Sequence, residues 1–252
     1  MLIPCLLFVI TLGCKTASGP IIPAISSMSA AQLTAYNDTF DVLDKDRWEF
    51  GYFIGEEERF DNFKTADLFV KDGKFTITTQ KGVFSKAGVG TRFYLAGDFD
   101  VQMDCELTFL PHAGAMDQRI MFALVEKDAK LTQATLPTIL FVQKEGHPAV
   151  GWSGCIVNGK LKGTFWNKIK GFKGTVRFVR TGKKVSLFVR EFGKSGWKKL
   201  ESCSTAGREA VFFFSVQNFT FDRKKIKADF QVTCRFDNFT INAAEEIIES
   251  DI

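Results

Sequence analysis

One stretch of the sequence places four carboxylates where they could act together. They stand at even-numbered positions of an alternating polar and apolar segment, residues 98–109: Asp98, Asp100, Asp104 and Glu106. Because successive side chains of a β-strand point to opposite faces, these four share one face. Two carboxyl groups on one face, one protonated and one ionised, are the groups that glycoside hydrolysis uses. The same pattern also describes a solvated acidic strand face, so both interpretations stay open.

Aromatic and basic residues define a second candidate site. Residues 158–200 contain thirteen lysines and arginines but a single acidic residue, Glu191. Such an imbalance favours an anionic partner. Polar neighbours indicate that three tryptophans are partly exposed, where an indole ring can stack on a sugar. The candidate glycan-binding residues are Trp152, Trp166, Trp197, Lys168, Lys170 and Lys173. The alternatives are a solvated basic face and tryptophans that simply pack.

A structural metal ion is a further candidate ligand. Oxygen atoms of Asp38, Asp237 and Asn238, near the two ends of the domain, could hold Ca²⁺, which prefers oxygen ligands. No other cofactor is expected. His112 and His147 each stand beside a proline without metal-ligand spacing, which indicates surface loops.

The N-terminus has the character of an export signal. Residues 1–13 are almost wholly apolar but too short to span a bilayer, and small residues follow them. Leu12-Gly13-Cys14 resembles the end of a bacterial lipoprotein box, which would make Cys14 a lipidation site; simple cleavage is the alternative. We therefore expect an exported protein, either membrane-anchored or secreted. The leader is placed at residues 1–14 and a flexible tether at 15–35.

Four further cysteines form no CxxC pair, so neither a zinc site nor a thioredoxin-type site is indicated: Cys105, Cys155, Cys203 and Cys234. They could form two disulfides in three connectivities. The alternation around Cys105 and Cys234 fits two buried thiols equally well.

The fold class follows from the period of the pattern. From residue 36 apolar residues recur with period two, as in strands that bury one face. Asp72-Gly73 and Asn158-Gly159 separate apolar segments in the manner of tight hairpin turns. Many short strands without a convincing amphipathic helix predict an all-β protein, an antiparallel two-sheet β-sandwich over residues 36–242. Residues 243–252 are expected to form an acidic tail, either a frayed helix or a disordered end.

Several passages resemble the concanavalin A-like lectin/glucanase superfamily, and most closely its bacterial exported domains of unknown function. They are Thr39–Asp44 with Trp48, Tyr94–Val101, Val176–Gly182 with Gly196-Trp197, and Phe236–Ile241. The resemblance implies a laminin-G-like jelly roll whose concave face often binds glycans. The superfamily's glucanases carry a Glu-x-Asp-x-Glu or Glu-x-Asp-x-x-Glu strand, which this chain lacks. The order of strands places that motif near Thr138–Val142, which has no carboxylate. Gln102–Glu106 comes close to the motif but has Gln in the place of the first Glu and lies on an earlier strand.

These observations favour a non-catalytic module that binds a glycan or another cell-envelope component, with acidic polysaccharide as a candidate partner. The alternatives are a divergent glycoside hydrolase or polysaccharide lyase that uses the Asp98–Glu106 face, and a purely structural envelope lipoprotein. Export argues against nucleic acid as a partner. Contact with a membrane is expected only through a lipid attached to Cys14.

Overall fold

The computed structural model describes residues 25, 27–51, 63–109, 117–127, 135–144, 147–219 and 231–250. The expected leader with Cys14, and also His112, lie outside the described residues. Within them, no helix combines the length and the apolar character needed to cross a bilayer.

Antiparallel strands make up almost the whole of the described chain. One short helix, α1 (Ala30–Thr34), precedes them. The strands are β1 (Trp48–Phe50), β2 (Phe63–Thr65), β3 (Asp67–Lys71), β4 (Lys74–Thr78), β5 (Phe84–Thr91), β6 (Phe93–Thr108), β7 (Asp117–Glu126), β8 (Thr135–Gln143), β9 (Ala149–Val157), β10 (Lys160–Ile169), β11 (Gly171–Thr181), β12 (Lys184–Glu191), β13 (Lys198–Ser204), β14 (Ala210–Phe219) and β15 (Thr233–Glu249).

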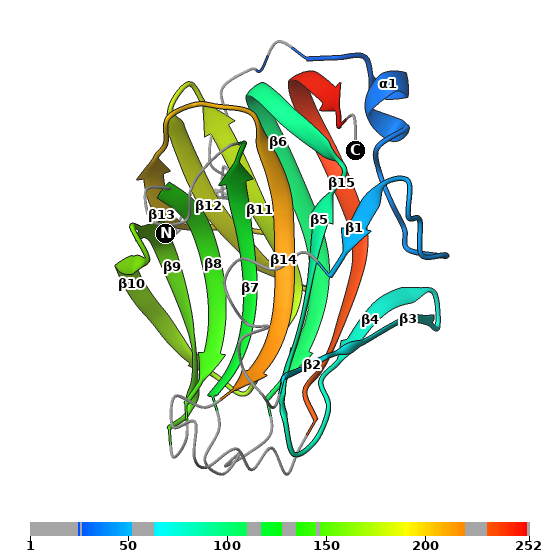
Figure 1. Cartoon of the computed structure of the whole chain (residues 1–252). Coiled ribbons are helices and arrows are strands. Elements are labelled where there is room, and N and C mark those ends of the chain that lie inside the picture. The colour runs from blue at the N-terminus through cyan, green and yellow to red at the C-terminus, as the bar shows by residue number, and fades with distance from the viewer. Residues whose placement is uncertain are drawn as a thin grey trace, which may run out of the picture.

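The strands lie in two layers (Figure 1). The front layer has the order β10-β9-β8-β7-β14-β5, with β1 and β2 both bonded to β5. The back layer has the order β13-β12-β11-β6-β15-β4-β3. A single residue pair, Ala210 with Leu95, joins the layers into one hydrogen-bonded sheet. The predicted antiparallel two-sheet β-sandwich is confirmed, with β2 and β5 as a short parallel exception.

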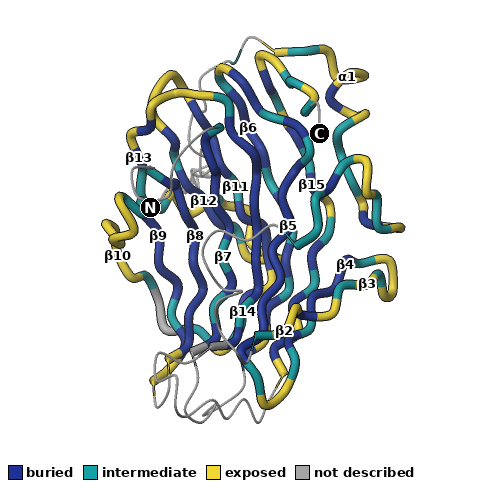
Figure 2. Tube along the Cα trace, viewed as in Figure 1, coloured by how far each residue is buried: buried dark blue, intermediate teal, exposed yellow. Residues whose placement is uncertain are grey.

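The core fills the space between the layers (Figure 2). In β6 the side chains of Phe99, Val101 and Met103 are fully buried, because the alternation of the sequence turns every second residue inward. Phenylalanine dominates the contact between layers. The rings of Phe214 on β14 and Phe236 on β15 lie 4.5 Å apart between centroids. Large rings of this kind bury much apolar area, which explains the 27 phenylalanines of the chain.

Both predicted hairpin turns form. Asp72 and Gly73 have φ of 54° and 67°, and Asn158 and Gly159 have φ of 50° and 72°. A two-residue turn with positive φ at both positions matches the twist of the flanking strands. These turns join β3 to β4 and β9 to β10.

The structure moves both expected domain boundaries. Within the expected tether, residues 27–35 are ordered. The helix α1 begins with a capping box between Ser29 and Gln32, and its Leu33 is buried. The Met28 amide also donates to the Ala244 carbonyl of β15 at 2.9 Å. The expected acidic tail is a strand instead, because β15 continues to Glu249 and pairs with β6. Register shifts along β15 break the strict alternation of polar and apolar residues, so the sequence pattern did not predict a strand here.

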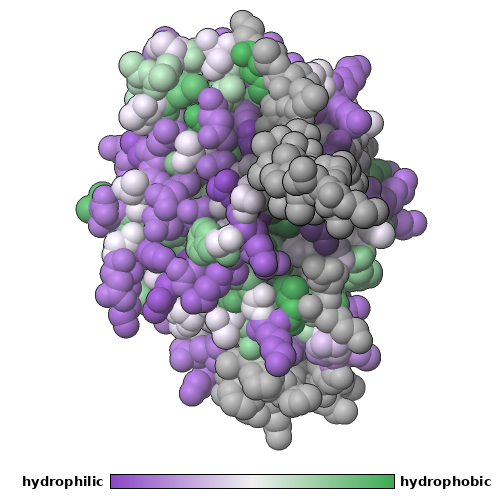
Figure 3. All heavy atoms as spheres, turned by 180° about the vertical axis from the view of Figure 1, so that it is seen from behind, coloured by the Kyte–Doolittle hydropathy of each residue, from purple (hydrophilic) through white to green (hydrophobic). Residues whose placement is uncertain are grey.

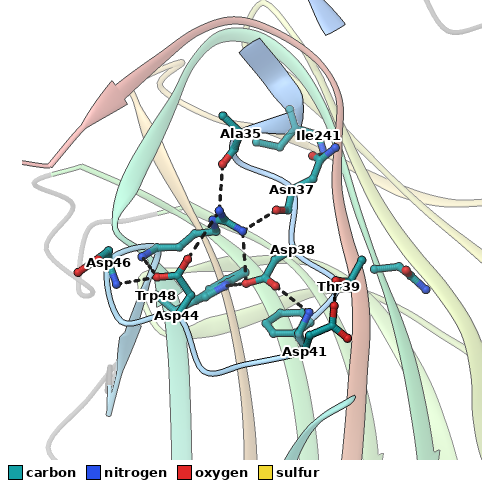
Figure 4. A network of polar contacts seen from close by, with 12 residues as sticks. Ala35, Asn37, Asp38, Thr39, Asp41, Asp44, Asp46, Trp48 and Ile241 are labelled. Carbon is teal, nitrogen blue, oxygen red and sulfur yellow. Dashed lines mark hydrogen bonds and ion pairs between the residues drawn. The ribbon is translucent and has the colours of Figure 1, made fainter. Parts of the chain in front are cut away.

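A polar clamp holds the segment before β1 against β15 (Figure 4). The Arg47 guanidinium donates to the Asn37 carbonyl at 2.5 Å and lies 3.7 Å from the Asp38 carboxylate. Trp48 Nε1 donates to the same carboxylate at 2.7 Å. The Ile241 amide of β15 donates to Asn37 Oδ1 at 2.8 Å. These contacts anchor Trp48, which is fully buried, in the core.

The cysteines divide into one bridge and two thiols. A disulfide joins Cys155 of β9 to Cys203 of β13 and so links the two layers. Cys105 and Cys234 are buried free thiols, as one of the two interpretations expected. Burial raises the pKa of both thiols well above the usual range, so they stay protonated and inert near neutral pH.

Candidate functional site

The four predicted carboxylates share the outer face of the back layer. Their alternation with Phe99, Val101, Met103 and Cys105 turns them away from the core. Seen from behind, the described part of this face is mainly hydrophilic with scattered apolar side chains (Figure 3).

Structural bonds occupy the carboxylates at the upper end of this face. Asp98 accepts a hydrogen bond from the Gly182 amide at 2.5 Å. Asp100 accepts from Arg177 Nε at 2.7 Å, pairs with the same guanidinium through its other oxygen, and accepts from Asn242 at 3.1 Å. These two groups stabilise the sheet. Neither carboxylate is simply solvated, and neither is free to act in acid–base catalysis.

The other two carboxylates line a hollow of about 90 Å³, which we call the β6 hollow. Its walls come from β4, β6, β15 and the residue after β12, and they are Lys74, Asp104, Cys105, Glu106, Phe192, Arg235, Asp237 and Asn238. The register explains the assembly, because Asp237 lies opposite Asp104 and Arg235 lies opposite Glu106 on neighbouring strands. Phe192 is 48% exposed, so its ring forms an apolar wall open to solvent.

Hydrogen bonds fix the polar groups of the hollow. Asp104 accepts from Thr175 Oγ1 at 2.6 Å and from Asn238 Nδ2 at 3.1 Å. Asn238 has a φ of 47°, a left-handed conformation that asparagine tolerates, and it lies in a bulge of β15. The bulge turns the Asn238 amide toward β6, which strict alternation would not do. The polar wall of the hollow is therefore held in place before any ligand arrives.

The pKa values of two carboxyl groups in the hollow are shifted in opposite directions. A hydrogen bond from Lys74, aided by Lys173 at 3.5 Å, lowers the pKa of Glu106. Burial raises the pKa of Asp237, and the neighbouring Asp104 adds to that shift. Glu106 is thus a stable anion, whereas Asp237 takes up a proton more readily than a free aspartate.

We expect a carboxyl NMR titration to separate these two groups. Asp237 should titrate above the usual aspartate value of about 3.9 and Glu106 below the usual glutamate value of about 4.3. The depressed pKa of Glu106 means that its ion pairs stabilise the fold above about pH 4.3 and are lost as the pH falls through the lowered value. Lys74→Met should raise the pKa of Glu106, because the hydrogen bond and charge of Lys74 are lost. A Glu106 that titrates above Asp237 would contradict the assignment.

The three predicted tryptophans do not form a platform. Trp152 is buried at 1% exposure, against the expectation of partial exposure. Trp166 packs edge-on against Phe141 with ring centroids 5.6 Å apart, and its face is covered by Lys198 at 5.2 Å. Trp197 is half-buried, with the guanidinium groups of Arg177 and Arg190 over its ring at 5.0 and 4.5 Å.

Two of the three predicted lysines have side chains in the described part of the structure. Lys170 is exposed. Lys173 is exposed as well, but pairs with Glu106 next to the hollow. Lys168 lies in β10, and its side chain is outside the described part of the structure.

The expected calcium ligands fall into two places. One carboxylate oxygen of Asp38 accepts a hydrogen bond from the Phe40 amide at 2.7 Å, and the other accepts from Trp48 Nε1 as part of the clamp. Asp237 and Asn238 line the hollow instead. The described residues contain no group of three or more histidine, cysteine, aspartate or glutamate side chains placed to hold a metal ion. His147 is exposed in a turn, as expected.

On the outer face of the front layer, β8 and β9 carry an apolar cluster. On β8 the residues Ile139 and Phe141 belong to the core, so Thr138, Leu140 and Val142 point to the other side. Leu140 and Val142 form a separate buried cluster there with Trp152 of β9. The strand that the resemblance assigns to a catalytic carboxylate pair therefore carries none, in agreement with the sequence.

Three residues of the hollow escaped the sequence analysis. Asp104 and Glu106 were found from alternation, and Asp237 and Asn238 were named for a different ligand. Lys74, Arg235 and Phe192 were missed because only the register of separate strands brings them together. An aromatic residue directly before a glycine at a strand end, as in Phe192-Gly193, is the one local signal available.

Comparison with known proteins gives structural matches only. Neither family models nor curated protein sequences match this chain. A glycoside hydrolase family protein from Mycobacterium thermorestibile matches with a TM-score of 0.58 and 11% identity, over 81% of this chain and 98% of that chain. A β-1,3-1,4-glucanase (lichenase) from a mouse hindgut metagenome matches with 0.54 and 11%, over 82% and 98%. The CBM2 module of the evolved Dit of Lactobacillus casei BL23 phage J-1 matches with 0.55 and 9%, over 82% and 95%.

At these identities the matches establish the fold alone. The chain has the same jelly-roll sandwich as these glycoside hydrolase and glucanase structures, so the fold that the resemblance implied is confirmed. The same fold carries both hydrolases and a CBM2 module, and therefore the function must be argued from the site.

Proposed function

We propose that this protein is a non-catalytic glycan-binding module and that the β6 hollow is its ligand site. The observation that carries the proposal is the composition of the hollow. An exposed phenyl ring stands beside fixed carboxylate, amide and cationic groups. A sugar ring offers an apolar C–H face to an aromatic ring and hydroxyl groups to such polar partners, and convergent polar groups next to an apolar wall are typical of small-ligand sites.

The state of the carboxylates supports binding over hydrolysis. Glycoside hydrolysis needs one carboxylic acid that donates a proton and one carboxylate that attacks or activates water. Glu106 is held as an anion by two lysines, and Asp104 is occupied by Thr175 and Asn238. In the front layer, β8 carries no carboxylate that could complete such a pair.

A divergent hydrolase is the second candidate, and one observation favours it. Asp237 has a raised pKa and lies opposite Asp104, so a carboxyl group that takes up a proton more readily than usual faces a second carboxyl group in the hollow. Release of reducing ends from a polysaccharide panel, abolished by Asp237→Asn, would establish this candidate and overturn the non-catalytic proposal.

A glycan array followed by calorimetry with the full chain tests the proposal. Phe192→Ala should weaken binding of the best array ligand at least about tenfold, or about 1.4 kcal/mol, because the apolar wall is lost. Phe69→Ala is the matched control, since Phe69 is also partly exposed but lies on the edge strand β3. The control should bind as the wild type does. Equal losses in both variants, or no glycan bound at millimolar concentration, would refute the proposal.

A further inference from the structure

A second surface is charged and lies apart from the walls of the β6 hollow. β10 ends the front layer and β13 ends the back layer, and the two edges meet along one side of the sandwich. Four exposed lysines lie on these strands: Lys160, Lys162, Lys198 and Lys199. We call them the basic side.

Contacts between the edges bring the lysines together. Lys162 pairs in register with Cys155, whose disulfide reaches Cys203 of β13. Thr164 of β10 donates a hydrogen bond to Glu201 of β13. Lys198 of β13 lies over the Trp166 ring of β10. These contacts link the two strands through side chains, and Lys160, Lys162 and Lys198 lie on the side of their strands that faces this junction.

Nothing in the described part of the structure neutralises these charges. None of the four lysines has an ion-pair partner there, whereas Lys74 and Lys173 pair with Glu106 and Lys127 pairs with Glu209. The carboxylate that β13 does carry, Glu201, accepts the bond from Thr164. The basic side therefore presents positive charge that is free for an external anion.

Protection of the edges does not account for this arrangement. Lysine on an edge strand prevents pairing with another chain, and both β10 and β13 are edges. The opposite edge strand β3 needs no such excess, because exposed Asp67 and Asp72 accompany Lys71 there. Mixed charge protects that edge, so the one-signed charge of the basic side calls for a different explanation.

We propose that the basic side binds a linear acidic polysaccharide that carries sulfate or carboxylate groups. Lys160 and Lys162 are two residues apart on one strand face, about 7 Å, a spacing that suits a chain of repeated anions. The disulfide is typical of proteins in oxidising compartments, where nucleic acid is not the usual polyanion.

An anionic membrane fits this surface less well. The exposed apolar residues of β10, Leu161 and Phe165, alternate with Lys160 and Lys162 and so point to the opposite face of the strand. A flat lipid surface cannot contact both sets of side chains at once. A polymer chain that follows the junction of β10 and β13 can instead contact Lys160, Lys162 and Lys198, which face it.

Heparin, a sulfated polysaccharide, is the probe for the test. The full chain is compared with a variant that carries Lys160→Gln, Lys162→Gln, Lys198→Gln and Lys199→Gln. Its control carries Lys45→Gln, Lys64→Gln, Lys71→Gln and Lys81→Gln, four exposed lysines elsewhere, so both variants have the same net charge. Circular dichroism melting verifies that both fold.

We expect the first variant to bind heparin about thirtyfold more weakly at low salt and to show a shallower dependence of log Kd on log salt, since fewer counterions are released. The control should stay within about threefold of the wild type. Equal losses in both variants would show an effect of net charge only and overturn the proposal, as would wild-type binding to duplex DNA or phosphatidylserine vesicles in preference to heparin. Phe192→Ala should bind heparin normally, which separates this proposal from that of the hollow.

Discussion

Replacement of Arg180 by methionine should lower the free energy of unfolding by about 3 to 5 kcal/mol. Arg180 is 1% exposed at the end of β11, where the two layers join. Its guanidinium donates to the carbonyls of Gly97 at 2.5 Å and Leu95 at 3.3 Å on β6, and to that of Arg208 before β14. It also lies 4.4 Å from the centre of the Phe99 ring.

The size of the effect follows from the acceptors that are left behind. Methionine fills similar space but donates nothing, so three carbonyls next to the joint lose their partner. Lysine should restore only part of the loss, because one ammonium group cannot reproduce the planar fork of arginine. Urea unfolding followed by tryptophan fluorescence measures the difference. Arg208→Ala, which removes an exposed side chain and keeps the carbonyl, is the control and should change stability by less than about 0.5 kcal/mol. A methionine variant within 1 kcal/mol of the wild type would contradict this role for Arg180.

Loss of the disulfide should cost about 3 to 4 kcal/mol. Cys155 and Cys203 are 48 residues apart, and closing a loop of that length restricts the unfolded chain strongly. In the double variant Cys155→Ala/Cys203→Ala, β9 and β13 lose their covalent link, while the Thr164–Glu201 bond and the Lys198–Trp166 contact between β10 and β13 remain.

The reductant dependence of unfolding gives the control for this experiment. Reductant should lower the urea midpoint of the wild type to that of the double variant and leave the variant unchanged, because Cys105 and Cys234 are already thiols. A wild type that mass spectrometry shows to be reduced, yet which unfolds at its original midpoint, would count against a stabilising bridge.

The elements that the sequence predicted well are those with local causes. Asn158-Gly159 determines its own turn through positive φ, and the alternation in β6 sorts Phe99 and Asp100 to opposite faces without help from other strands. A layered β fold follows, because strands that are apolar on one face must bury that face against other strands.

Trp152 shows why exposure could not be predicted in the same way. Its polar neighbours Gly151 and Ser153 suggested an exposed ring, but adjacent residues of a strand point to the opposite face. The residues that decide its surroundings lie opposite in register, Leu140 on β8 and Phe165 on β10. Register depends on strand pairing over long sequence distances, and for the same reason the β6 hollow could not be assembled from the sequence.

The position of β15 has a consequence for the order of events during synthesis. The last strand of the chain lies between β6 and β4, inside the back layer, so that layer stays incomplete until residues 233–249 have been made. Between the end of β6 and the start of β15 the ribosome adds more than a hundred residues, which takes on the order of ten seconds. During that time one edge of β6 lacks its partner strand. The incompletely folded nascent chain is then accessible to chaperones and proteases, and it can still pass through a channel that admits only unfolded protein. A stop codon anywhere before β15 should therefore yield a chain that never acquires a native back layer, however much of the rest is present.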